Sequence, residues 1–565
     1  MMQYLNPIYS EETRCQDCYK CIRECPVKAI RVVNGEAEVI PDTCILCGHC
    51  VDACPVRAKK VRNDLRRAIH LLRRKSKCIL SLAPSFVGEF RHATPAQLIH
   101  AVKKLGFYGV SETALGAQEV SSAVVELMNG TRGPVFSSAC PAAVELIQNH
   151  LPQLSDLISP VFSPLLAHCN MLRQLYGEQI GIVFVGPCIA KKHEADNHPD
   201  LLDVAITFED LQNWLDTQEI DPSQQDADRD DVFIPEESQN GALYPVEGGM
   251  ISTIRNRVRE KDAVYLTLSG VSNIRNALES LQGELFSRPM FFELLACENG
   301  CVAGPKATNR TSIHSRLSVL DYAALKKEDQ SLCPPEKIEL RYRPKTREQD
   351  EISHDQIQSA LASFGKTRRD DELNCGSCGY GSCREFACAI VQKKAESCMC
   401  VSYMRSLAQK KANALIKTIP YGVVVVDRNL RIIECNDNFA ALFGDEISHV
   451  HEVCPGLKSA DLKKVIPFHE LFSKVLSTGN EITQHFVKTA EKTLAVTIFT
   501  VEPNQVAGAI MRDATRTELR REQIVEKAQE VIRNTSTTAQ EIAFLMGKNA
   551  SQSEKILNSL IESFS

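Results

Sequence analysis

The sequence contains no apolar stretch long enough to span a bilayer, and its first residues, MMQYLNPIYSEETRC, lack the basic and apolar regions of a signal peptide. Charge of one sign does not dominate either, because 65 Lys and Arg face 71 Asp and Glu, for a net charge of −6. These absences argue against a membrane span, a leader, and a nucleic-acid or membrane partner. We therefore expect a cytoplasmic protein whose 565 residues form several domains.

Cysteine is abundant instead, with 23 residues, most of them in short-spaced clusters. Two runs near the start repeat the spacing C-x2-C-x2-C-x3-C-P, which is typical of paired 4Fe–4S clusters in a ferredoxin-like module. Zinc sites rarely use such runs, and disulfides need an oxidising compartment. Exposed clusters of this kind indicate an anaerobe. In such pairs the fourth cysteine of each run binds the other cluster, so the expected ligand sets are Cys15, Cys18, Cys21 and Cys54, and Cys44, Cys47, Cys50 and Cys25.

Apolar runs alternate with amphipathic segments from residue 78 onward, which predicts an α/β fold. The run IGIVFVG predicts a buried parallel strand, and RVV and AEVI predict small strands between the two cysteine runs. The basic stretch 59–77 has helical spacing and is interpreted as a solvated helix, with docking of an acidic redox partner as the alternative. The predicted fold class is multidomain, α+β and α/β. The expected domains are 1–77 with the ferredoxin-like module, 78–345, 346–405 with a linker and a third cysteine cluster, 406–515, and a helical tail 516–565.

Three motifs within 78–345 resemble, in order, the three signatures of the iron-only (FeFe) hydrogenases. They are SSACPAAV at 137–144, VGPCIAKKHE at 185–194 and FFELLACENGCVAG at 291–304. The resemblance implies a hydrogenase domain whose cubane is held by Cys140, Cys188, Cys297 and Cys301. It also implies that Cys301 bridges to a two-iron unit carrying CO and cyanide, the two parts together forming an H-cluster. The x3 spacing of Cys297 and Cys301 predicts that one helical turn brings both thiols to one face.

Residues beside these cysteines have expected roles in the same site. The resemblance implies that Lys191 binds a cyanide of the two-iron unit, and a lysine so close to Cys188 can donate a charge-assisted hydrogen bond. Glu194 completes C-x2-K-x2-E and is expected to order this loop. Pro84 and Ser85 follow the strand CILSL and resemble the Ala-Pro-Ser loop of the family, with Ser85 as a donor to a diatomic ligand.

The motifs depart from the family at the proton route. The first motif of the family has two adjacent cysteines, of which the first carries protons, and here Ala139 stands at that shuttle position. Ala123 and Val124 stand near the register of an acidic pair of the family, with Glu119 or Glu126 as open substitutes. Alanine can neither donate nor accept a proton, and positioned proton transfer typically contributes about 10²–10⁴-fold to a rate. We therefore expect slow H2 turnover, which suits detection better than metabolism.

The third cysteine cluster, at 375–400, resembles the 4Fe–4S modules of corrinoid and electron-bifurcating proteins. Its C-x2-C-x4-C run is followed by a helix and further cysteines, and glycines in the run let the loop turn tightly. Cys388 lies within the helix and is expected in the core, and a zinc ribbon is the alternative reading of the cluster. The expected ligands are Cys375, Cys378, Cys383, and either Cys398 or Cys400.

Residues 412–515 resemble a PAS sensor domain. The segment ALIKTIPYGVVVVDRNLRIIECNDNFAALFG has the order amphipathic helix, turn, two strands, then Asn before a helix. The sequence shows no haem- or flavin-specific pattern in this segment. The tail 516–565 has apolar residues at helical spacing, which predicts a signalling helix and a homodimer. Since no kinase ATP-site motif or phosphatase metal cluster is visible, the output would need a separate kinase or phosphatase.

These features favour a hydrogen-sensing iron-only hydrogenase with four 4Fe–4S clusters, in which the redox or ligand state is relayed to the PAS domain and the tail. A metabolic hydrogenase that exchanges electrons with a small carrier such as ferredoxin is one alternative. An iron–sulfur assembly protein that keeps the four cysteines without the two-iron unit is another.

Overall fold

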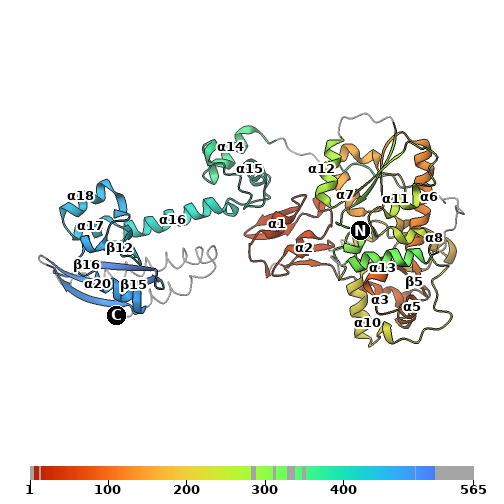
Figure 1. The fold of residues 1–565 in the computed structure, drawn as a ribbon, viewed down its shortest axis with the longest axis horizontal. Coiled ribbons are helices and arrows are strands. Elements are labelled where there is room, and N and C mark those ends of the chain that lie inside the picture. The colour runs from red at the N-terminus through yellow and green to blue at the C-terminus, as the bar shows by residue number, and fades with distance from the viewer. Residues whose placement is uncertain are drawn as a thin grey trace. The chain divides into compact units, whose positions relative to one another are not determined.

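The computed structural model divides the chain into two compact units, Met1–Met399 and Cys400–Ser565. Elements are labelled in Figure 1, and each unit is described by itself. The predicted helical tail 516–565, with the predicted dimer contact, lies outside the described residues. No helix in the part of the chain that the structure describes is both long and apolar enough to cross a membrane. The described residues are 6–11, 14–281, 288–308, 313–326, 338–345, 352–489 and 492–515.

The ferredoxin-like module consists of two small antiparallel strand pairs and two short helices that begin within the cysteine runs. Its elements are β1 (Ile8–Ser10), α1 (Lys20–Glu24), β2 (Ile30–Val33), β3 (Glu36–Val39), α2 (His49–Ala53) and β4 (Lys59–Val61). Strand β1 pairs with β4, and β2 pairs with β3, which confirms the strands predicted from RVV and AEVI. The basic stretch then forms α3 (Leu65–Arg74), whose side chains Arg66, Arg73 and Arg74 are exposed.

Two parallel sheets form the core that follows. The first contains, in spatial order, β6 (Gly109–Glu112), β5 (Cys78–Leu82), β8 (Gly181–Gly186) and β9 (Val204–Thr207). The second contains β10 (Val264–Ser269), β11 (Pro289–Leu295) and β7 (Gly133–Phe136). Every residue of the first sheet is buried, as expected of parallel strands covered on both faces. The apolar run IGIVFVG is the buried parallel strand β8, as predicted.

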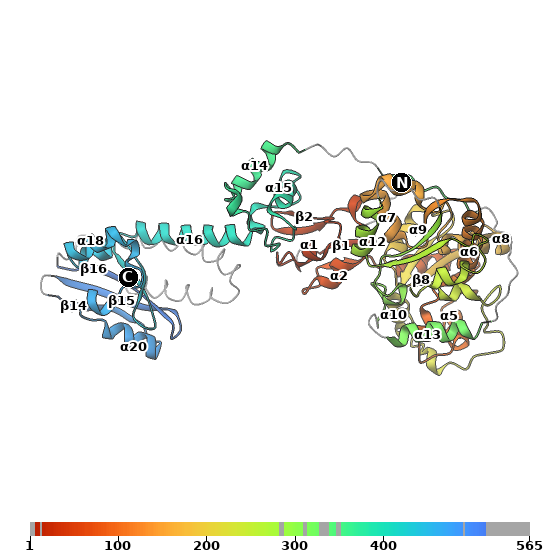
Figure 2. The same cartoon turned by 45° about the horizontal axis from the view of Figure 1, so that its top comes forward.

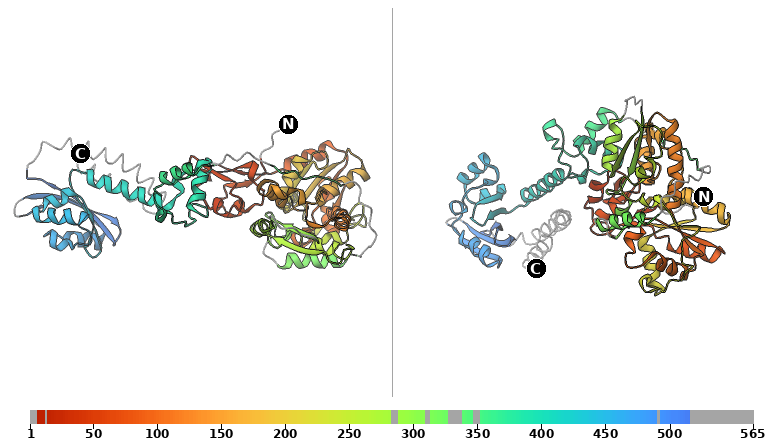
Figure 3. Two further views of the ribbon diagram at one scale, coloured as in Figure 1. Left: turned by 90° about the horizontal axis from the view of Figure 1, so that it is seen from above. Right: turned by 45° about the vertical axis from the view of Figure 1, so that its right-hand side comes forward.

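Helices pack around these sheets (Figure 3). They are α4 (Phe86–Glu89), α5 (Pro95–Lys104), α6 (Ala114–Gly130), α7 (Pro141–His150), α8 (Pro164–Tyr176), α9 (Ala190–Asn197), α10 (Phe208–Thr217), α11 (Gly249–Ile254), α12 (Val271–Ser280) and α13 (Ile313–Ala324). Most of the connections place a helix between successive parallel strands, which is the α/β arrangement predicted from the alternating pattern.

Helices α6 and α8 pack tightly against each other at Gly116. A Cβ atom on this residue would lie 2.2 Å from the carbonyl oxygen of Pro164 and 2.4 Å from the backbone nitrogen of His168. These neighbours are backbone atoms and cannot move aside without moving α8. The absence of a side chain at Gly116 therefore fixes the position of His168 relative to α6.

We expect Gly116→Ala to lower the stability of the first unit. Overpacking of a tight core typically costs about 1–3 kcal/mol, which outweighs the gain of about 1 kcal/mol that alanine brings to a helix. The matched control is Gly130→Ala on the same helix, where no atom lies within 4 Å of the added Cβ. Calorimetry should show a lower melting temperature for Gly116→Ala and an unchanged or higher one for Gly130→Ala. Equal melting temperatures for both variants would contradict the packing described here.

The stretch predicted as a linker contains ordered structure of its own. Helix α14 (His354–Ser363) begins at Ser353, whose side chain accepts a hydrogen bond from the backbone of Gln356, and the Gln356 side chain accepts one in return. It packs against α15 (Cys383–Val391) through Phe364 and Phe386, whose ring centroids are 5.0 Å apart. The charged composition of 345–372 concealed this helix, because its apolar face is narrow and its cap is polar.

The second unit begins with the long helix α16 (Val401–Thr418), which runs without a break across residue 406. A five-stranded antiparallel sheet follows, with helix α20 packed against it (Figure 2). In spatial order its strands are β13 (Ile432–Cys435), β12 (Gly422–Asp427), β16 (Val506–Asp513), β15 (Thr493–Glu502) and β14 (Ile482–Lys488). The helices are α17 (Asp437–Leu442), α18 (Asp445–Val453), α19 (Leu462–Val465) and α20 (Glu470–Thr478).

The Asn436 side chain links strand β12 to helix α16 through hydrogen bonds. Its Oδ1 accepts hydrogen bonds from the backbone nitrogens of Val423 and Phe439, and its Nδ2 donates to the carbonyl oxygens of Ile416 and Tyr421. The asparagine predicted before a helix is therefore the N-cap of α17 and a buried link between β12, β13 and α16.

Candidate metal centre

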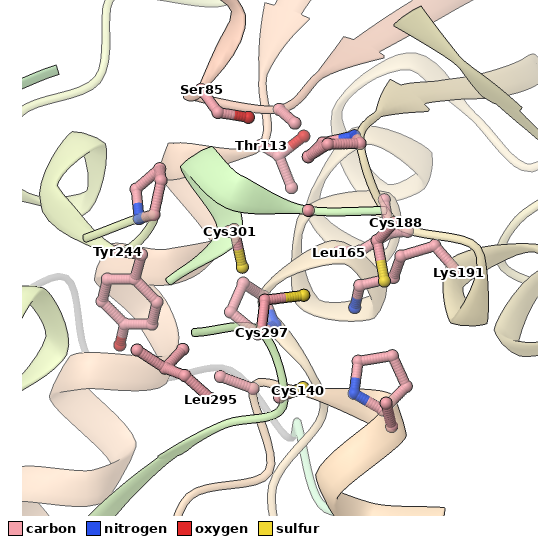
Figure 4. Close-up of a pocket in the computed structure, with 18 of the residues that line it drawn as sticks. Ser85, Thr113, Cys140, Leu165, Cys188, Lys191, Tyr244, Leu295, Cys297 and Cys301 are labelled. Atoms are coloured by element: carbon pink, nitrogen blue, oxygen red, sulfur yellow. The ribbon is translucent and has the colours of Figure 1, made fainter. Parts of the chain in front are cut away.

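Four distant cysteines come together where strands of the two sheets end. Cys140 follows β7 and is the N-cap of α7, and Cys188 lies in the loop between β8 and α9. Cys297 follows β11, and Cys301 begins a short 3₁₀ helix, Cys301–Ala303. All four line one cavity, with their thiols turned toward its interior (Figure 4). The carboxyl ends of parallel strands are where open α/β sheets place their ligands, which explains why these loops meet.

The segment between Cys297 and Cys301 is a turn and not the helical turn predicted from its spacing. Asn299 has a φ of 65° and Gly300 a φ of 87°, so the backbone enters the left-handed region twice. A side chain on Gly300 would also come within 2.3 Å of the carbonyl oxygen of Pro245. Both thiols still face the same cavity, so the spacing identified the pair but not the backbone that presents it.

The cavity is mostly apolar and includes about 960 Å³ of space free of protein atoms, counting its mouth. Burial raises the pKa of Cys188 to about 11 and raises the pKa values of Cys297 and Cys301 above their ordinary range. Converging thiolates repel one another in such a site unless a cation neutralises them. A cluster of iron ions supplies that charge, and thiolates are its preferred ligands, so this donor set fits an iron–sulfur cluster.

Lys191 and Glu194 form a buried pair on α9 beside Cys188. The Lys191 Nζ lies 2.7 Å from Glu194 Oε2 and donates a second hydrogen bond, at 3.0 Å, to Ser163 Oγ. Lys191 also lines the cavity, where its charge lowers the pKa of Cys188 against the effect of burial. The ammonium group has three protons, of which these two contacts use two.

Pro84 and Ser85 line the same cavity as Lys191, and Ser85 is drawn in Figure 4. Ser85 is buried, and its Oγ has no hydrogen-bond partner among the residues that the structure describes. A buried hydroxyl without a partner is costly, so this orphan atom fits a cavity that holds a group with acceptor atoms. Thr113, which no motif singled out, lines the same cavity.

The wall around Ala139 is apolar. Ala139 lines the cavity, and it packs in one hydrophobic cluster with Ala123, Val124 and Met250. Val124 and Met250 are fully enclosed, at 0% and 1% exposure. None of these three positions, 139, 123 and 124, carries a proton donor or acceptor.

One cysteine of the ferredoxin-like module also lines this cavity. Cys47 is among the lining residues, and the next residue, Gly48, has a φ of 85° and lies so close to Pro305 that an added Cβ would come within 2.5 Å of it. Burial raises the pKa of Cys21 to about 11 and those of Cys44 and Cys47 each to about 12. The second cysteine run thus adjoins the four-cysteine site, which the spacing of the run alone did not reveal.

The cysteines of the third cluster lie on a loop and at helix ends. Cys375 is exposed, Cys378 is half-buried, and Cys383 begins α15 with its backbone nitrogen bonded to Asn374 Oδ1 at 2.8 Å. Cys398 lies in a short 3₁₀ helix, 3.4 Å from Glu396 Oε2, and burial raises its pKa. Cys388 is half-buried within α15 and so is not fully in the core. Cys400, the other proposed fourth ligand, is buried at the N-cap of α16 in the second unit.

Family models match four parts of the chain. Residues 76–305 match the iron only hydrogenase large subunit, C-terminal domain, and residues 7–55 match a 4Fe-4S dicluster domain. Residues 371–402 match an Fe–S cluster model, and residues 411–472 match a PAS domain. The four cavity cysteines therefore belong to the segment that matches the iron-only hydrogenase model, which follows the dicluster match and precedes the PAS match in the sequence.

Curated relatives point the same way at low identity. Iron hydrogenase 1 of Clostridium pasteurianum is 24% identical over 306 residues, which are 43% of this chain and 53% of the relative. The NADP-reducing hydrogenase subunit HndD of Solidesulfovibrio fructosivorans is 23% identical over 356 residues, 52% of this chain and 56% of the relative. The chain thus spans about half the length of the curated relatives it matches.

Among solved structures, a variant of the [FeFe]-hydrogenase HydA1 from Chlamydomonas reinhardtii is 18% identical, with a TM-score of 0.40, over 50% of this chain and 99% of that one. The HydA(deltaEFG) structure is also 18% identical, with a TM-score of 0.37, over 47% and 91% of the two chains. From its matching domains, the protein is FeFe-hydrogenase-like, with iron–sulfur domains and a PAS domain.

Proposed function

We propose that the protein is a hydrogen-sensing iron-only hydrogenase of low turnover. The observation that carries this proposal is the cavity in which Cys140, Cys188, Cys297 and Cys301 face Lys191 while the wall at Ala139 is apolar. The four thiols would hold a 4Fe–4S cubane, with Cys301 as the bridge to a two-iron unit. That unit, when bound, supplies the site at which dihydrogen is taken up and cleaved.

The side chains of the cavity would hold and orient the two-iron unit. Lys191 offers its third ammonium proton to a cyanide, Glu194 and Ser163 fix the ammonium in place, and Ser85 offers a hydroxyl. Pro84 shapes the apolar wall beside Ser85. The alanine at 139 withholds the usual proton carrier, so protons would leave slowly.

Electrons would pass through the ferredoxin-like module. Its cluster on Cys44, Cys47, Cys50 and Cys25 would adjoin the cubane, because Cys47 lines the same cavity as the four ligands. The cluster on Cys15, Cys18, Cys21 and Cys54 and the cluster at 375–400 would extend the route. A small redox carrier such as ferredoxin would exchange electrons with these clusters. The PAS domain, in a homodimer, would pass the redox or ligand state of the site to a separate kinase or phosphatase.

Turnover and conformational response together distinguish this proposal from a metabolic role. We expect H2 oxidation by the maturated full-length protein to stay below about 1 s⁻¹, under the range of about 1–10³ s⁻¹ typical of enzymes. Hydrogen–deuterium exchange in residues 400–515 should differ between H2 and N2. Fast steady turnover with no change in exchange would favour the metabolic alternative.

Glu194→Gln tests whether the pair beside Cys188 orders the site. The neutral amide leaves the Lys191 ammonium buried without its counter-charge, and loss of such a supporting partner typically costs about 10–100-fold in metal affinity or activity. The matched control is Glu209→Gln, which removes an exposed ion pair with Lys306. Iron content per chain and H2 oxidation should fall for Glu194→Gln only. Wild-type values in both variants would mean that Glu194 does not support the site.

A further inference from the structure

A chain of buried hydroxyls and one imidazole leads away from the cavity at Thr113. Thr113 Oγ1 lies 2.8 Å from Ser81 Oγ, and Ser81 Oγ lies 2.8 Å from His168 Nδ1. The other ring nitrogen, Nε2, lies 2.7 Å from Ser111 Oγ. Ser81, His168 and Ser111 are each 0% exposed, and Thr113 is 5% exposed.

Strand pairing and helix packing bring these four side chains together. Ser81 on β5 and Ser111 on β6 are direct neighbours in the parallel register, so both hydroxyls reach the same imidazole. His168 comes from α8, whose approach depends on Gly116 in α6. Thr113 is the N-cap of α6, but its side chain makes no capping hydrogen bond. Its hydroxyl instead contacts Ser81, and the residue lines the cavity.

His168 remains neutral in this setting. Burial lowers its pKa to about 3, and both of its ring contacts are hydroxyl groups. A neutral imidazole has one N–H donor and one acceptor nitrogen, so its tautomer decides the direction of every hydrogen bond in the chain.

Two directions are available. If Nδ1 carries the proton, it donates to Ser81, Ser81 donates to Thr113, Ser111 donates to Nε2, and the Thr113 proton is free for the cavity. If Nε2 carries the proton, every hydrogen bond reverses. Thr113 then donates to Ser81, and Ser111 has no acceptor among these four side chains. A buried donor without an acceptor is unfavourable, so an acceptor in the cavity selects the first direction.

We propose that Thr113 donates a hydrogen bond to a diatomic ligand of the two-iron unit, and that Ser81, His168 and Ser111 are positioning residues that direct its hydroxyl into the cavity. This inference rests on the proposed function, because it needs the two-iron unit as the acceptor. It adds a third polar side chain to Lys191 and Ser85, which line the same cavity.

Infrared spectra of the maturated full-length protein in H2O and D2O test the proposal. In the natural protein at least one CO or cyanide band should shift on deuteration. Thr113→Val keeps the shape of the side chain and removes the hydroxyl, so it should move that band and abolish the part of the isotope shift that Thr113 causes. Thr113→Ser, the matched control, should retain both. Ser111→Ala, which lies outside the cavity lining, should move the same band by a smaller amount.

The outcomes separate the two proposals. One outcome is that the CO and cyanide bands have the same positions and isotope shifts in the natural protein, in Thr113→Val and in Ser111→Ala. That result would overturn the role of Thr113 and leave the proposed function intact. Absence of CO and cyanide bands from the natural protein would overturn both. If Thr113→Val does not acquire the two-iron unit, the spectrum of Ser111→Ala gives the test. A band shifted from its position in the natural protein supports the role of Thr113, and unshifted bands overturn it. The EPR signals of the other clusters report folding in every variant.

Discussion

Cys301→Ala is expected to abolish H2 oxidation and to remove CO and cyanide bands from the infrared spectrum, while the other iron–sulfur clusters remain. Cys301 is one of four cysteines facing the cavity, and it is the proposed bridge between the cubane and the two-iron unit. Leu295 and Tyr244, which line the same cavity, cannot supply a thiolate in its place. Loss should therefore be complete, in contrast to the partial losses expected at Glu194.

Cys169→Ala is the matched control. Cys169 is fully buried in α8, packs in the main hydrophobic cluster, and is not one of the residues that line the cavity. Its replacement should cost about 1–2 kcal/mol of stability through lost packing but leave H2 oxidation and the infrared bands unchanged. Activity and bands in Cys301→Ala equal to those of Cys169→Ala would show that Cys301 holds no part of the centre.

Ala139→Cys is expected to raise the rate of H2 oxidation by about 10–10²-fold, the lower part of what positioned proton transfer contributes. The thiol would stand in the cavity wall and restore a proton carrier at its edge. The gain should stop short of the full effect, because Ala123 and Val124 behind it still offer no acceptor. The solvent isotope effect on turnover should change as well.

Ala142→Cys controls for the mere presence of a new thiol. Ala142 lines the same cavity from α7, but it does not occupy the shuttle position. Turnover should rise in Ala139→Cys and stay at the natural level in Ala142→Cys. Natural turnover and natural spectra in both variants would mean that position 139 is not the entry to a proton route.

The cysteines of the candidate metal centres could be found in the sequence because the ligand requirements of metal clusters constrain cysteine spacing. The two cysteine runs identified the dicluster module, and the three motifs identified four residues that the structure gathers in one cavity. The apolar run before Cys188 predicted β8 for the same reason, since a strand buried on both faces must be apolar throughout.

The contacts between segments could not be read in this way. Ser81 and Ser111 are single polar residues inside buried strands, and only the pairing of β5 with β6 and the packing of α8 show that they share His168. The nearness of Cys47 to the four-cysteine cavity likewise depends on how the module packs at Gly48 and Pro305. The turn at Asn299 and Gly300 was mistaken for a helix because an x3 spacing fits both.

The central claim is that four thiols hold an iron centre that carries CO and cyanide and captures dihydrogen. Infrared spectroscopy of the maturated full-length protein, first under N2 and then under H2, tests it most directly. We predict CO and cyanide bands under N2 whose positions change when H2 is admitted. A protein with its full complement of iron–sulfur clusters but without any such band would contradict the account.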